Sequence, residues 1–166
     1  MTAVVARQPH ADPAVAEELR ALMAAAYAVE AELLGVADFA PLRRTAAHVA
    51  ATDAEFIGIR EDGALVAAAE LERPEPAHTH IGALVVRPDR FRRGLASALL
   101  AALVRDRFAD ALTVSTGAAN TPAVRLYERH GFAIERRWAT PDGIPMVTLR
   151  RGPAPGGSVP SPEAPR

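Results

Sequence analysis

Four arginines lie within seven residues, between one apolar segment and the next. Residues 79–86 predict a strand that ends at Pro88, and the segment that begins at Gly94 predicts a helix. The first backbone N–H groups of a helix have no partner inside the helix and lie at the positive end of its dipole, so they can bind an anion. Gly94 and Ala96 are small, which lets a phosphate approach the main chain closely. Guanidinium groups suit phosphate oxygens, and those around this point belong to Arg87, Arg90, Arg92 and Arg93.

This pattern predicts a diphosphate site, although other interpretations fit clustered arginines. The cluster could be a solvated surface, and that alternative stays open. A nucleic-acid surface is disfavoured because no aromatic residues alternate with the arginines and the formal net charge of the chain is −1. A dinucleotide-binding turn is disfavoured because Gly-x-Gly-x-x-Gly is absent.

A second group of residues could act on a bound substrate. Asn120 and Pro122 are typical of a helix start, and Gly131 is typical of the position just after a helix end. Ala123 and Tyr127 are four residues apart, so they share one face of this short helix. Tyr127 could serve as a proton donor, or it could be a core aromatic residue with a satisfied hydroxyl group.

The first group resembles motif A of the GNAT superfamily of N-acetyltransferases, Arg/Gln-x-x-Gly-x-Gly/Ala. Val86-x-Pro88 precedes it and Gly94-x-Ala96 carries the small residues, while Phe91 stands where the motif has Arg or Gln. The resemblance implies that coenzyme A is bound through main-chain groups. Its pyrophosphate would contact the N–H groups of Arg92, Arg93, Gly94, Leu95, Ala96 and Ser97, and its pantetheine arm would pair with Leu84, Val85 and Val86.

The second group resembles GNAT motif B, Asn-x-x-Ala-x-x-x-Tyr followed by Gly-Phe, which is matched here up to Phe132. The resemblance implies that Asn120 contacts the pantetheine and that Tyr127 protonates the departing thiolate. It also implies that acetyl-CoA gives its acetyl group directly to a primary amine of a small molecule or peptide, within a ternary complex. A strand N–H near Leu84 or Val85 would stabilise the oxyanion.

Neither motif supplies the general base. Alternation along 79–86 places His80 on the same side as Leu84 and Val86. His80 lies six residues before Val86, where the histone-acetyltransferase branch of the superfamily carries its glutamate base, and imidazole has a suitable pKa. Glu70 is the alternative base, together with Glu72, and each of these residues could instead be a solvated strand-end residue.

We expect no metal, because His78 and His80 have no third ligand at a useful spacing. The acceptor amine would be held by residues 27–39 and 73–80, for which the family has no common code. Glu30 and Glu32 could attract a cationic amine, although carboxylates on exposed helix faces are usually solvated. A homodimer is possible, and the alternative function is a catalytically silent acyl-CoA-binding regulatory module.

The elements that position these residues follow from hydrophobic periodicity and turn residues. We expect strands at 3–7, 55–60, 64–72, 79–86, 112–115, 132–138 and 146–150, and helices at 13–34, 41–51, 94–108 and 122–130. Residues 73–76 contain two prolines and predict a loop. The resemblance implies the α/β GNAT fold: a mixed sheet of about six to seven strands, flanked by four helices and split between the strands of motifs A and B.

Length and composition predict one domain, residues 1–150, and a disordered Pro/Gly-rich tail, residues 151–166. The resemblance implies that this domain is a GNAT acetyltransferase domain. The absence of Cys excludes disulfides and thiolate catalysis. All 19 basic residues are arginines, which is typical of a GC-rich, here bacterial, genome. We expect a cytoplasmic protein with no membrane partner, because no signal-peptide pattern is present and the longest nearly apolar run, 21–29, is too short to span a bilayer.

Overall fold

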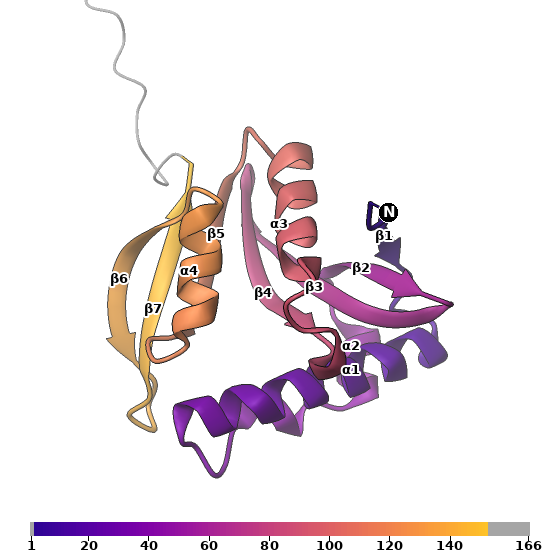
Figure 1. Ribbon diagram of the computed structural model, residues 1–166, viewed down its shortest axis with the longest axis horizontal. Coiled ribbons are helices and arrows are strands. Elements are labelled where there is room, and N and C mark those ends of the chain that lie inside the picture. Colours follow the sequence, from indigo (N-terminus) through magenta and orange to yellow (C-terminus); the bar gives the residue numbers. More distant parts are fainter. Residues whose placement is uncertain (1, 153–166) are drawn as a thin grey trace, which may run out of the picture.

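A seven-stranded mixed sheet runs through the structure, a computed structural model that describes residues 2–152 (Figure 1). The strands lie in the order β1-β2-β3-β4-β5-β7-β6, and only β4 and β5 pair in parallel. Their bounds are β1 Val5–Gln8, β2 Glu55–Glu61, β3 Ala64–Glu75, β4 His78–Val86, β5 Ala111–Gly117, β6 Ala133–Ala139 and β7 Pro145–Arg151. This architecture confirms the predicted fold class.

Helices cover both faces of the sheet. One face packs against α1 (Pro13–Leu34) and α2 (Ala46–Ala51), and the other packs against α3 (Leu95–Asp106) and α4 (Thr121–Arg129). Two short 3-10 helices, η1 (Ala40–Arg43) and η2 (Pro88–Arg90), complete the elements that the structure describes. The ends of α1 form as predicted: the Asp12 side chain accepts a hydrogen bond from the N–H of Ala14, and Gly35 ends the helix with a φ of 68°.

The sheet opens between β4 and β5, as the resemblance implied. These strands pair only from His78 to Ile81 on one side and from Ala111 to Val114 on the other. Beyond Ile81, β4 continues to pair with β3 while β5 pairs with β7, and the two strands diverge (Figure 1). One edge of the second half of β4 is therefore left open.

A β-bulge at Gly82 changes the side of the sheet on which β4 residues lie. Glu70 pairs with Ala83 and the next residue of β3 pairs with Ile81, so Gly82 is the extra residue. Leu84 packs with Ile81 and the α3 side chains, whereas His80 bonds to Thr113 on the opposite face. The prediction that His80 shares a side with Leu84 and Val86 is therefore wrong, because simple alternation does not continue through a bulge.

Several predicted boundaries differ from the structure. The expected helix 41–51 is interrupted, because Arg44 and Thr45 are extended and Thr45 caps a separate helix, α2. The expected loop 73–76 is largely strand, because β3 continues to Glu75. The first residue of β2 pairs with Leu71, so the part of β3 beyond Leu71 has no β2 neighbour. Pro74 can stand there because its missing N–H costs no hydrogen bond to β2. Arg151 belongs to β7, and residues 153–166 of the predicted tail lie outside the described part of the chain.

Candidate functional site

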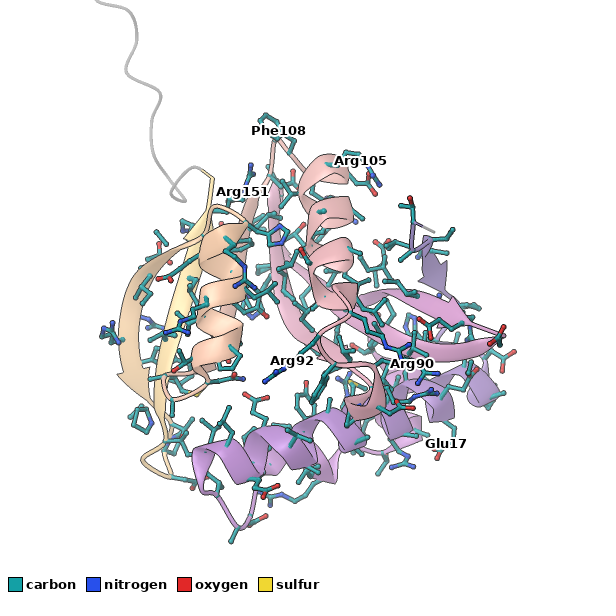
Figure 2. The ribbon with its side chains drawn as sticks, in the orientation of Figure 1. Glu17, Arg90, Arg92, Arg105, Phe108 and Arg151 are labelled. Carbon is teal, nitrogen blue, oxygen red and sulfur yellow. The ribbon has the colours of Figure 1, made fainter. Side chains whose placement is uncertain are left out.

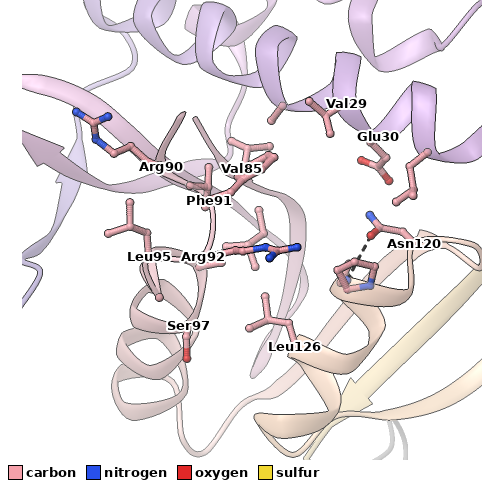
Figure 3. Close-up of a pocket in the computed structure, with 18 of the residues that line it drawn as sticks. Val29, Glu30, Val85, Arg90, Phe91, Arg92, Leu95, Ser97, Asn120 and Leu126 are labelled. Atoms are coloured by element: carbon pink, nitrogen blue, oxygen red, sulfur yellow. Dashed lines mark hydrogen bonds between the residues drawn. The ribbon is translucent and has the colours of Figure 1, made fainter. Parts of the chain in front are cut away.

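A cavity of about 480 Å³ lies where the sheet opens (Figure 3). Its walls are the second half of α1, the end of β4, the turn into α3 and one face of α4. It brings together most of the predicted coenzyme-binding residues, namely Leu84, Val85, Val86, Arg92, Gly94, Leu95, Ala96, Ser97 and Asn120. Two of the predicted set, Arg93 and Tyr127, do not line it.

The N-terminus of α3 faces this cavity with unused backbone donors. Gly94 is the N-cap residue, with a φ of 75° and no side-chain cap. The first backbone bond of the helix runs from the N–H of Ala98 to the carbonyl of Gly94, so the N–H groups of Leu95, Ala96 and Ser97 precede the ladder. Among the described residues no acidic side chain occupies this first turn. The helix end therefore offers backbone donors that suit an anion, and the diphosphate site stays a prediction.

The turn before α3 is held in an unusual backbone conformation. Arg92 has a φ of 63°, which a residue with a side chain adopts only at a cost. Arg92 and Gly94 are both left-handed and are separated by one residue. In turns that contain left-handed residues, successive backbone N–H groups can point into one concave anion site. Such a turn brings backbone donors close to a bound oxyanion.

Two of the four predicted arginines are paired with carboxylates, although one of them, Arg90, also lines the cavity. Arg87 forms an ion pair with Asp89, with 2.6 Å between Nε and Oδ1. Arg90 pairs with Glu61 at 2.7 Å and with Asp89 at 2.9 Å. Arg92 extends into the cavity from the turn (Figure 3). The positive charge that faces the cavity is thus smaller than the sequence cluster indicated.

Arg129 supplies a positive charge that sequence reasoning missed. It lies in the last turn of α4 and lines the cavity opposite α3. A nearby hydrogen bond joins the two helices, because Ser97 Oγ lies 2.8 Å from His130 Nε2. In the sequence, Arg129 stands near the end of the helix expected at 122–130, where a basic residue is common. Its position across from the α3 N-terminus depends on tertiary structure.

The open edge of β4 forms another wall. Leu84, Val85 and Val86 line the cavity, and their backbone bonds on the closed edge go to β3. The groups on the open edge lie where an extended amide chain could add to the sheet. The geometry suits a pantetheine arm, whose amide groups could pair with a strand.

Asn120 and Tyr127 differ in their access to the cavity. The Asn120 side chain accepts a hydrogen bond from the N–H of Ala123 at 3.3 Å and so caps α4, while its amide group faces Glu30 (Figure 3). Tyr127 is a buried core residue whose ring packs against Phe132, with 5.6 Å between ring centroids. Burial, and then the nearby Glu30 carboxylate and Tyr27, raise the pKa of the Tyr127 phenol. The phenol is therefore protonated at neutral pH.

The Tyr127 hydroxyl forms no hydrogen bond with the part of the chain that is described. Every fully buried side-chain polar atom of those residues has a partner, so the phenol oxygen is not fully buried, although Tyr127 does not line the cavity. Tyr127 is thus a core aromatic residue, as the alternative interpretation held, but one whose hydroxyl remains available.

The predicted bases His80 and Glu70, and the further alternative Glu72, line neither this cavity nor a second one that adjoins it. His80 Nδ1 is 2.8 Å from Thr113 Oγ1, and burial is the main cause that lowers the pKa of His80. Glu70 is buried and forms a two-point ion pair with Arg44. Their roles as bases remain predictions, and the geometry favours neither residue.

A second cavity, of about 370 Å³, adjoins the first. Tyr27 and Glu30 of α1 line both cavities. The second one also contacts Gly82 of β4 and the loop between β6 and β7, including Asp142. Sequence reasoning placed residues 27–39 near an acceptor but gave no sign of this connection, which depends on how α1 lies across the open sheet (Figure 2).

No group of three or more His, Asp or Glu side chains within residues 2–152 is arranged to hold a metal ion. No described helix has the length and apolar character needed to cross a bilayer.

Comparison with known proteins adds a family match and a set of similar folds. The model of the acetyltransferase (GNAT) family matches residues 16–132. The UPF0157 protein YqkA of Bacillus subtilis strain 168 is 33% identical over 124 residues, which are 74% of this chain and 36% of that protein. This chain therefore spans about a third of the length of that curated relative.

Two solved structures share the fold. The ribosomal-protein-S18-alanine N-acetyltransferase from Escherichia coli has a TM-score of 0.70 at 18% identity, and the match covers 93% of this chain and 97% of that one. The PaiA N-acetyltransferase from Thermoplasma acidophilum, solved in complex with coenzyme A, has a TM-score of 0.68 at 13% identity, and the match covers 89% and 98%.

Proposed function

Because this chain belongs to the GNAT acetyltransferase family, we propose that it transfers the acetyl group of acetyl-CoA to a primary amine of a small molecule or peptide. The observation that carries the proposal is the α3 N-terminus, whose free N–H groups face a cavity beside the open edge of β4. Coenzyme A needs both features, since it joins a diphosphate to a chain with two amide groups. Similar proteins with coenzyme A bound support the same ligand.

In the proposed complex the pyrophosphate binds the N–H groups from Arg92 to Ser97, and the pantetheine arm pairs with Leu84–Val86. The thioester then lies between the end of β4 and α4. An N–H of Leu84 or Val85 stabilises the oxyanion, an interaction whose loss typically costs about two to three powers of ten in rate. Asn120 holds the pantetheine, and the protonated Tyr127 phenol supplies the proton that the thiolate needs.

The acceptor enters from the second cavity and attacks the thioester directly, in a ternary complex. No covalent enzyme intermediate is required, which agrees with a sequence that has no Cys. Residues 27–39 supply much of this cavity, including Tyr27 and Phe39. In the proposed complex the coenzyme occupies the first cavity and the acceptor occupies the second, and the two cavities meet at Tyr27 and Glu30 of α1.

The test is a screen for acetyl transfer. Purified protein and acetyl-CoA are incubated with amines, amino acids, peptides and aminoglycosides, and release of free thiol is followed. We expect release above the acceptor-free rate with at least one class of amine, and acetylated product by mass spectrometry. Binding of coenzyme A without transfer to any of these classes would instead support a silent acyl-CoA-binding module.

A further inference from the structure

Glu30 is the carboxylate at the junction of the two cavities. It lies one turn after Tyr27 on α1, so both side chains project from the same face of the helix. Both line the coenzyme cavity and the acceptor cavity. Figure 3 shows the Glu30 carboxylate pointing from α1 toward Asn120, at the beginning of α4. A group at this position can meet an amine that enters from one cavity and a thioester held in the other.

The surroundings of Glu30 suit a group that exchanges a proton. Burial raises its pKa, and a hydrogen bond from the Asn120 amide partly opposes that effect. The titratable groups around it are Tyr27 on the same helix and Tyr127 from α4. The other charged groups that line the two cavities are Arg90, Arg92 and Arg129 in the first and Asp142 in the second. Glu32, two residues further along, is exposed and lines neither cavity, which makes it a natural control.

We propose that Glu30 binds the ammonium group of the acceptor and accepts its proton. The inference rests on the proposed acetyl transfer and adds a base that the family motifs do not supply. Neither His80 nor Glu70 competes at this position, because the first is bonded to Thr113 and the second to Arg44.

The lining of the second cavity indicates the class of acceptor. Most of its wall away from Glu30 is apolar and comes from Leu34, Phe39, Pro41, Ile144 and Met146. The carboxylates on it are those of Glu30 and Asp142. Such a cavity favours a primary ammonium group carried on an apolar body and disfavours an anionic acceptor.

The protons and bonds of the transfer balance with these residues. The ammonium group gives one proton to Glu30, and its nitrogen lone pair forms a bond to the thioester carbonyl carbon. The C–S bond then breaks, and the thiolate takes the proton of Tyr127. The new amide nitrogen releases its second proton to the Tyr127 phenolate, and Glu30 returns the first proton to solvent.

Glu30 and Tyr127 are coupled through charge. The Glu30 carboxylate is one cause that raises the pKa of the Tyr127 phenol. When Glu30 takes up a proton its charge is lost, so the phenol becomes a stronger acid as the thiolate begins to leave. Proton uptake by Glu30 therefore favours the later proton donation by Tyr127.

The test compares Glu30→Gln with Glu32→Gln, using phenethylamine as acceptor. We expect Glu30→Gln to lower kcat/KM roughly 100-fold or more near neutral pH, and Glu32→Gln to match the wild type. In the wild type kcat/KM should fall as the pH drops through the raised pKa of Glu30. In Glu30→Gln this fall of kcat/KM at low pH should disappear. Instead, kcat/KM should rise with the fraction of unprotonated amine, so that high pH restores activity to the variant.

Several outcomes would overturn the inference. Equal activity of the two variants, or a loss in Glu30→Gln that is the same at every pH, would remove Glu30 as the base. Faster acetylation of glutamate than of phenethylamine by the wild type would overturn the acceptor class. Calorimetry with coenzyme A distinguishes a failure of the Glu30 inference from a failure of the proposed function. A wild-type protein that binds no coenzyme A contradicts the acetyltransferase activity itself.

Discussion

Arg44 and Glu70 form a two-point ion pair, with 2.6 Å between Nη1 and Oε2 and 2.8 Å between Nη2 and Oε1. The Glu70 side chain is 5% exposed and that of Arg44 is 27% exposed. Arg44 lies in the extended segment between η1 and α2, so the pair fastens this segment to β3. The pair thus holds Arg44 in the segment that interrupts the expected helix 41–51, and it gives the buried Glu70 carboxylate a charged partner.

Arg44→Met should destabilise the protein because it leaves the Glu70 carboxylate buried without its partner. We expect a loss of about 2 kcal/mol in the free energy of unfolding, below the value typical of a fully buried pair because Arg44 is partly exposed. Adding Glu70→Met should recover most of the loss. Urea unfolding of the two single variants and the double variant measures this, and simple additivity would contradict the coupling.

Gly94→Ala tests the turn at the α3 N-terminus. The φ of 75° should make the substitution cost about 1–2 kcal/mol, although no atom lies within 4 Å of the added Cβ. Gly63, in the turn between β2 and β3, has a φ of 81° and the same open surroundings, so Gly63→Ala is a matched control. We expect similar thermal destabilisation in both variants but weaker coenzyme A binding in Gly94→Ala alone. Equal binding by the two would contradict the proposed pyrophosphate site.

Arg129→Ala should weaken coenzyme A binding by roughly fivefold to tenfold, because it removes a charge-assisted contact to phosphate. Arg87→Ala should have little effect, since Arg87 is paired with Asp89. The difference in coenzyme A affinity between the two variants should shrink as salt is added, because salt screens exposed charges. Calorimetric titration at two ionic strengths measures this, and a larger effect of Arg87→Ala would show that the wrong arginine has been assigned.

Tyr127→Phe should lower kcat by roughly 100-fold while coenzyme A affinity stays nearly constant. The variant keeps the ring that packs against Phe132 and removes only the hydroxyl, which has no partner among residues 2–152. Stability should therefore change little, and a thermal melt serves as the control. Unchanged turnover would refute the role of the phenol as acid.

Much of the fold could be predicted from the sequence because its signals are local. Asp12-Pro13 and Gly35 mark the ends of α1, and the small residues at Gly94 and Ala96 mark the turn into α3. Long apolar periodicity defines the helices between such signals. The motif residues of α3 and α4 were recognisable from their resemblance to the two GNAT motifs.

What the sequence did not predict depends on contacts between distant segments. The bulge at Gly82 reverses the side on which His80 lies, and it becomes visible only in the pairing of β4 with β3. The position of Glu30 between two cavities depends on how α1 crosses the open sheet, and that of Arg129 on how α4 lies opposite α3. A helical carboxylate or a terminal arginine looks the same in sequence whether it is solvated or functional.

Titration with coenzyme A by isothermal calorimetry tests the central claim most directly, since every proposed step begins with a diphosphate held at the α3 N-terminus. The account predicts saturable binding at one site in the wild type, weakened by added salt and by Gly94→Ala but not by Gly63→Ala. A folded wild-type protein that shows no binding at high protein concentration would contradict it.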